Sequence, residues 1–98
     1  MADAPQPHNV QLQIQLDEET AQGTYVNMAM VNHTETEFTL DMIYVQPQQP
    51  KAKVRARIVT SPKHMKRLLL VMQEQIQRYE QRFGSIEILR FPPGTLPQ

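Results

Sequence analysis

The sequence predicts an α+β fold in which an antiparallel sheet of four to five strands is followed by one long C-terminal helix packed on one face. Between residues 10 and 59 several stretches alternate apolar and polar residues, the period-two pattern of half-buried strands. After Ser61 and Pro62 the apolar spacing changes to three and four, which is typical of a helix. Strands that all precede a helix favour the α+β class over a parallel sheet.

The length of 98 residues predicts one small domain. We expect a disordered N-terminal segment (residues 1–9), a single α+β domain (10–88) and a proline-rich tail (89–98). A chain of this size buries only roughly 60–65% of its unfolded surface, so self-association is a common way to complete its core.

The first predicted strand spans residues 10–16. Val10, Leu12, Ile14 and Leu16 alternate with three glutamines, so one face is apolar and the other is wet. Because the solvent-facing side carries amides and no charge, this strand also fits an exposed sheet edge that pairs with a binding partner.

The second predicted strand spans residues 24–32 and offers apolar residues on both faces. One face carries Val26, Met28 and Met30. The opposite face carries Tyr25, Asn27, Ala29 and Val31. The face that meets the core stays open here, because a one-residue change in the following turn exchanges the two.

Residues 37–45 and 51–59 predict a strand pair joined by a five-residue loop that contains two prolines. In this register Val45 lies opposite Lys51 and Asp41 opposite Arg55, an ion pair that contributes roughly 0.2–1 kcal/mol. The apolar face would then pair large residues with small or β-branched ones, namely Tyr44 with Ala52, Met42 with Val54, Leu40 with Ala56 and Phe38 with Ile58.

The long helix is predicted over residues 62–83. Ser61 is a good N-cap, Pro62 suits the first helical position, and Gly84 suits the residue after the helix. The apolar residues form one continuous stripe, widened by Leu68 and Val71: Met65, Leu69, Met72, Ile76, Tyr79 and Phe83. Residues 85–91 predict a short fifth strand.

Four blocks of the sequence carry a resemblance to a known family. They read GTYVN (23–27), HTETEFTLD (33–41), PKAKVRARIVTSPKHMKRLL (50–69) and YEQRFGSI (79–86). The chain resembles the small prokaryotic proteins grouped as domain-of-unknown-function family 3467 over roughly residues 10–87. The resemblance implies a natural domain and brings no catalytic or binding residues with it.

The net charge is zero, but residues 1–50 contain seven acids and no Lys or Arg, whereas residues 51–98 contain all ten Lys and Arg and three acids. Such asymmetry fits either a nucleic-acid surface or two halves that lie against each other. The absence of cysteine fits a reducing compartment. No apolar run is long enough for a membrane span and the N-terminus lacks the features of a signal peptide, so we expect a cytoplasmic protein.

A basic surface is the strongest candidate for a ligand site. Its residues alternate on one strand and continue into the helix, and they are Lys51, Lys53, Arg55, Arg57, Lys63, Lys66 and Arg67. Such a row fits single-stranded DNA or RNA, although no aromatic residue alternates with the cations. A solvated face matched by acids such as Asp41 explains the same pattern.

An interaction surface is the favoured function. The candidate interface residues are apolar positions for which the predicted core has no clear place: Leu68, Leu70, Val26, Met28 and Met30. We therefore expect a non-enzymatic homodimer that also binds another protein. We predict no catalytic residue, cofactor, metal or small-molecule substrate, because Ser61 is needed as a cap beside His64 and no third orienting group is apparent.

Overall fold

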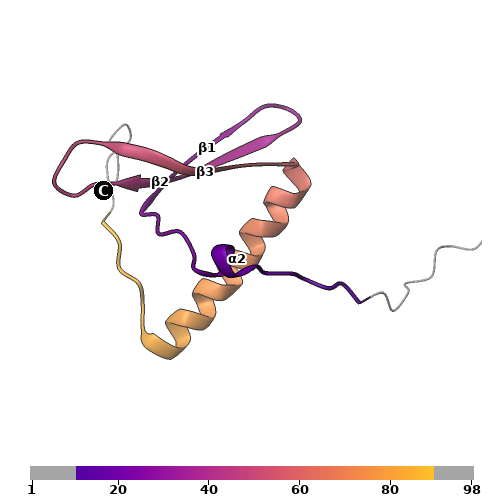
Figure 1. Cartoon of the computed structure of the whole chain (residues 1–98). Coiled ribbons are helices and arrows are strands. Elements are labelled where there is room, and N and C mark those ends of the chain that lie inside the picture. Colours follow the sequence, from indigo (N-terminus) through magenta and orange to yellow (C-terminus); the bar gives the residue numbers. More distant parts are fainter. Residues whose placement is uncertain (1–10, 90–98) are drawn as a thin grey trace, which may run out of the picture.

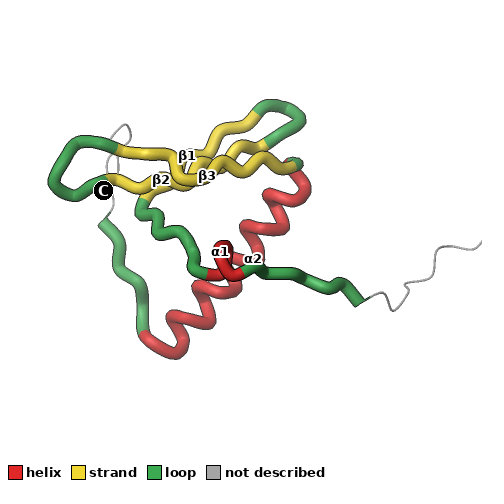
Figure 2. The backbone as a smooth tube through the Cα atoms, viewed as in Figure 1, coloured by secondary structure: helices red, strands yellow, loops and turns green. Residues whose placement is uncertain are grey.

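The computed structural model describes residues 11–89. In chain order the elements are helix α1 (Glu18–Ala21), strands β1 (Met28–His33), β2 (Phe38–Val45) and β3 (Ala52–Thr60), and helix α2 (Pro62–Phe83). The strands form one antiparallel sheet in the order β1-β2-β3 (Figures 1 and 2). The predicted α+β class is confirmed. The predicted N-terminal segment 1–9 lies outside the described residues, as does the predicted tail except for Leu89.

The prediction of four to five strands is wrong, because the sheet has three. Residues 11–17 form no strand and run clear of the sheet in Figure 1. Leu12 and Ile14 are 82% and 86% exposed. Their alternation is that of a strand, but a strand also needs a neighbour for its backbone groups, and none lies beside this segment. The described part of the predicted fifth strand, up to Leu89, is likewise outside any strand.

The predicted register of β2 and β3 is also wrong by two residues over most of its length. Asp41 lies opposite Arg57, not Arg55. The remaining pairs move in the same way: Leu40 faces Ile58, Met42 faces Ala56 and Phe38 faces Thr60.

Two single-residue shifts cause this difference. Val45 pairs with Ala52, so the connection is one residue longer than predicted, and an irregularity between Met42 and Ile43 leaves Arg55 as an extra residue on β3. Each one-residue shift exchanges the two faces of a strand. The first shift places Tyr44 opposite Lys53 instead of Ala52. The second shift exchanges the faces back, so residues from Ala56 onward lie on the faces that were predicted for them.

The central strand β2 holds the best-buried side chains. Ile43 is 4% exposed and Asp41 is 5% exposed, and among residues 11–89 only these two are buried. The end of β2 is fixed by Asn27, whose side-chain amide donates to the Val45 carbonyl (3.1 Å) and whose amide oxygen accepts from the Val45 N–H (2.8 Å). This side chain continues the ladder where β1 has not yet begun.

Helix α2 begins and ends where the sequence predicts. Ser61 Oγ accepts from the backbone N–H of His64 at 3.1 Å, and Pro62 occupies the first turn. Gly84 follows with φ 101°, and its N–H donates to the Glu80 carbonyl. Such a positive φ favours glycine. No helix in the described range 11–89 has the length and apolar character needed to cross a membrane.

The predicted packing of α2 on one face of the sheet is not what the structure shows. Only Ser61 separates β3 from α2, so there is no loop to turn the helix back along the strands. Figure 1 shows α2 running away from the sheet, and none of its residues is buried. Met65 and Leu68, near the start, are half-buried.

Replacing Ile43 by Ala tests the position of the core. Since Ile43 is 4% exposed, we expect Ile43→Ala to lower the free energy of unfolding by roughly 2–5 kcal/mol. Gln77→Ala is the control, because Gln77 is exposed and such changes stay within about 0.5 kcal/mol. Urea unfolding at one protein concentration measures both. Equal losses for the two variants would contradict this assignment of the core.

Candidate interaction surfaces

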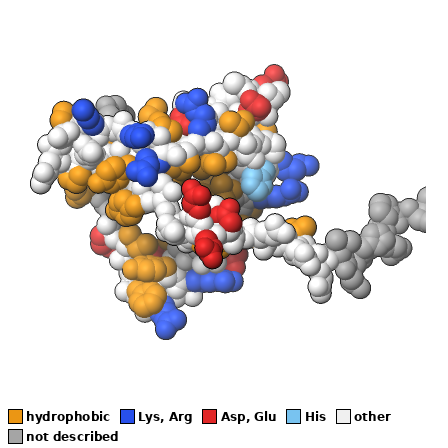
Figure 3. All heavy atoms as spheres, viewed as in Figure 1, with side chains coloured by type: hydrophobic (Ala, Val, Ile, Leu, Met, Phe, Trp, Pro, Cys, Tyr) orange, Lys and Arg blue, Asp and Glu red, His pale blue; other side chains and the backbone are white. Residues whose placement is uncertain are grey.

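The apolar stripe of α2 is uncovered over most of its length in the described chain. Met65, at its start, is half-buried, but Leu69 is 44% exposed and Phe83 64% exposed. The stripe residues Met72, Ile76 and Tyr79, between them, are exposed as well. Figure 3 shows hydrophobic side chains gathered at the lower end of the molecule, where Figure 1 places the end of α2. A helix with an apolar stripe normally buries it against another element, and no element among residues 11–89 covers this one.

The other predicted interface residues fall into two groups. Leu70 is exposed and Leu68 is half-buried, both on α2. On β1, Met28 lies opposite Ile43 and Met30 opposite Asp41, so these methionines share the face of the two buried residues. This placement answers the question left open by the sequence. Val26, just before β1, is half-buried.

An ion pair spans the centre of the sheet between β2 and β3. Arg57 Nε donates to Asp41 Oδ1 at 2.7 Å, and its Nη2 donates to Oδ2 at 3.0 Å. The Asp41 side chain is 7% exposed and that of Arg57 65% exposed. The hydrogen bonds from Arg57 lower the pKa of Asp41, with a smaller contribution from its charge, while burial acts in the opposite direction. Arg57 is therefore a structural partner of Asp41, not a free cation.

The basic residues of β3 do not share one face as predicted. Cross-strand partners lie on the same face of a sheet, so Lys53 shares the face of Tyr44 and Arg57 shares that of Asp41. Tyr44 and Asp41 are three residues apart on β2, which puts them on opposite faces. The extra residue at Arg55 is the physical reason, because it breaks the alternation between Lys53 and Arg57. Lys63, Lys66 and Arg67 are exposed in the first turns of α2.

The structure brings an aromatic ring to the remaining cations, which sequence reasoning missed. Tyr44 and Gln46 border an open depression together with Lys51, Lys53 and Arg55. The ring of Tyr25 meets that of Tyr44 edge-on, with centroids 6.2 Å apart. Tyr44 was missed because the predicted register assigned it to Ala52. The longer loop is what moves it opposite Lys53.

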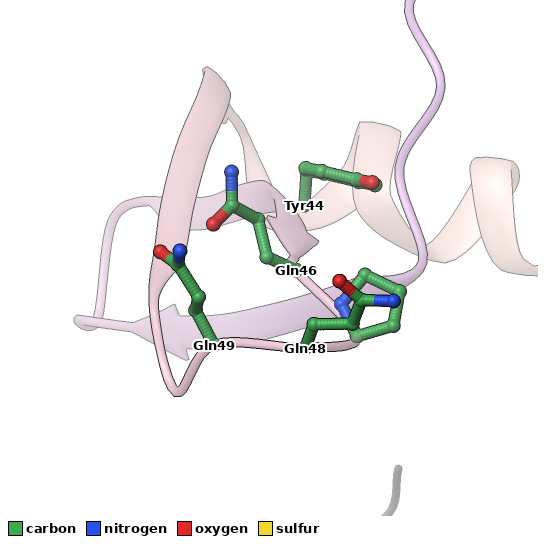
Figure 4. Close-up of a pocket in the computed structure, with 5 residues that line it drawn as sticks. Tyr44, Gln46, Gln48 and Gln49 are labelled. Carbon is green, nitrogen blue, oxygen red and sulfur yellow. The ribbon is translucent and has the colours of Figure 1, made fainter.

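A second depression lies at the tip of the β2–β3 connection. Figure 4 shows Tyr44, Gln46, Gln48 and Gln49 around it, all from the end of β2 and the loop that follows. Its lining offers amides and a phenol but no carboxylate, amine or imidazole. We assign no chemistry to this place.

His33 and Ser61 have structural contacts. His33 stacks on Phe38 with ring centroids 5.3 Å apart, and Ser61 Oγ caps α2 at the N–H of His64. Within residues 11–89 no three His, Asp or Glu side chains gather closely enough to hold a metal.

The comparisons with known proteins place the chain in a family. The family model described as "Protein of unknown function (DUF3467)" matches residues 1–88, and the chain belongs to this family. The predicted resemblance is thereby confirmed. Neither the curated proteins nor the solved structures include a significant match.

The Asp41–Arg57 pair predicts how stability depends on pH. Because the folded pKa of Asp41 lies below its ordinary value of 3.8, the pair stabilises the fold fully above that value. This contribution is lost as the pH falls through the lowered folded pKa. The pKa of Asp17 is lowered as well, mainly by the backbone hydrogen bond from Thr20, so wild type has two such contributions.

Asp41→Asn isolates the first contribution. We expect the variant to be less stable than wild type at about pH 7, and the difference in urea midpoint to shrink toward about pH 2. Urea titrations of both proteins across this range measure it. A difference of the same size at both ends would show that the charge of Asp41 is not what matters.

Proposed function

We propose that this protein is a non-enzymatic, homo-oligomeric protein-binding module of the cytoplasm. A second copy of the chain is its first partner and another protein its second. The observation that carries the proposal is the uncovered stripe of α2, whose side chains Leu69, Met72, Ile76, Tyr79 and Phe83 are 44–64% exposed. Monomeric proteins rarely expose contiguous apolar patches larger than a few hundred Å². The cytoplasmic location rests on the absence of cysteine, which fits a reducing compartment.

A second copy is the simplest cover for this stripe. Among residues 11–89 no element covers the stripe, and a copy of the same helix brings an identical stripe. Two such stripes related by a two-fold axis are self-complementary, which is how the commonest oligomers are built. The exposed ion pair of Glu74 and Arg78 fits a polar rim beside such a contact.

Ile76→Asp tests the stripe, and Gln77→Asp is its matched control. Both add one carboxylate at adjacent exposed positions of α2, but only Ile76 belongs to the stripe. A two-fold contact loses two buried isoleucines, each contributing roughly 1.5–3 kcal/mol. We therefore expect the dissociation constant of the Ile76→Asp dimer to rise at least about 100-fold. Gln77→Asp should stay close to wild type.

Size-exclusion chromatography with light scattering measures the mass of each variant over a dilution series. A monomeric mass for wild type at micromolar concentration would overturn the proposal. An Ile76→Asp dimer as tight as the control would remove α2 from the contact.

Binding of single-stranded nucleic acid is the second candidate function, and the position of Tyr44 favours it. A phenol ring beside Lys51, Lys53 and Arg55 combines a stacking platform with cations, the two parts that single-strand binders use. The splitting of the basic residues over two faces acts against it, since Arg57 is held by Asp41 on the other side.

Tyr44→Ala and Tyr44→Phe test this second function. If a base stacks on the ring, Tyr44→Ala should weaken binding of labelled single-stranded DNA roughly 5- to 150-fold, while Tyr44→Phe retains it. Fluorescence anisotropy at low and physiological salt measures both. A log-log salt slope shallower than about −2 would mean that few phosphates are neutralised, and this function would then be dropped.

A further inference from the structure

We propose that residues 11–17 of one copy add as a fourth strand to the free edge of β3 in a second copy. This inference rests on the proposed self-association and names the segment that makes it. Two observations motivate it: a strand-like segment without a neighbour, and an open strand edge with the charge to select it.

The segment has the sequence pattern of a strand but no neighbouring strand. Its apolar residues alternate with glutamines, and Leu12 and Ile14 are 82% and 86% exposed. Residues 11–17 run apart from the sheet (Figure 1). An amphipathic strand gains its backbone hydrogen bonds only from another edge, and adding a strand to an exposed edge is a common mode of recognition.

Both outer strands of the sheet have free edges, since β1 and β3 each pair only with β2 among residues 11–89. Charge selects β3. The cations at its start, Lys51, Lys53 and Arg55, disfavour pairing with another β3, because like charges would face each other. The same cations favour a strand that ends in acids, and residues 11–16 are followed directly by Asp17, Glu18 and Glu19.

Charge also sets the direction of the added strand. In an antiparallel arrangement the end of the segment at Asp17 lies beside the start of β3, near Lys51 and Lys53. Its apolar residues then lie along Ala56 and Ile58, which share the face of Met42 and Leu40. The apolar side of the segment thereby extends the face of the sheet that carries Leu40, Met42 and Ile58. A parallel arrangement would leave Lys51 and Lys53 beside the uncharged start of the segment.

Cysteine pairing tests the contact, because the natural chain contains no cysteine. Two single variants are mixed under oxidising conditions, Ile14→Cys with Ala56→Cys. The matched control mixes Ile14→Cys with Ala29→Cys. Ala29 and Ala56 both pair with Met42, so they occupy the same row and face at the two opposite edges. Each residue is exposed, so these substitutions disturb no buried packing.

We expect a disulfide-linked dimer from the Ala56→Cys mixture and none from the control. Repeats with Leu12→Cys and Leu16→Cys cover a register shift of two residues. Linkage to Ala29→Cys instead, or to neither edge, would overturn the inference. A double variant Ile14→Cys, Ala56→Cys that links only within one chain would overturn it too.

Charge reversal separates this contact from the proposed dimer. Lys51→Glu with Lys53→Glu in the Ala56→Cys chain should reduce the linked fraction several-fold, and adding Glu18→Lys with Glu19→Lys in the Ile14→Cys chain should restore it. A dimeric mass by light scattering without any linkage would sink the inference and leave the proposed function standing. A monomeric mass would sink both.

Discussion

The apolar stripe along α2 constrains every account of this molecule. The helix leaves β3 after a single residue, Ser61, and its stripe from Leu69 to Phe83 stays largely exposed. The sheet is equally open, since only Ile43 and Asp41 on the central strand are buried among the described residues. A folded chain gains most of its stability by removing apolar surface from water. In this chain the stripe of α2 remains exposed to water. Association with a second copy would remove this apolar surface from water.

Two segments of the described chain offer different kinds of contact for this association. The stripe on α2 offers apolar area without directional hydrogen bonds, whereas residues 11–17 offer a backbone edge and a charge pattern. The proposed strand addition would compete with the proposed binding of nucleic acid, because both would use Lys51 and Lys53. A neutralised edge would leave Tyr44 without its neighbouring cations. The two functions considered for the basic edge are therefore alternatives at one place, and binding of one partner should weaken the other.

The bounds of the helix could be predicted to the exact residue, because they depend on local sequence signals. The register and the number of strands could not, because they depend on pairing between residues far apart in the sequence. Ser61, Pro62 and Gly84 fix the bounds of α2 through their own backbone preferences. The register of β3 depends instead on an extra residue at Arg55 and a longer loop, and neither has a local sequence signal as strong as a cap. The alternation at residues 11–16 gives the right local pattern, but nothing in that pattern says whether the neighbouring strand belongs to the same chain. In the same way, the spacing of apolar residues predicted the stripe of α2 correctly, but it could not show which element packs against that stripe.

The concentration dependence of unfolding tests the central claim most directly. If a second copy covers the surfaces that one chain leaves open, the natural protein is stabilised by mass action. Its urea midpoint should then rise steadily over a roughly hundredfold increase in protein concentration. A midpoint that stays constant over this range, with a single cooperative transition, would show that the isolated chain is complete and would contradict the account.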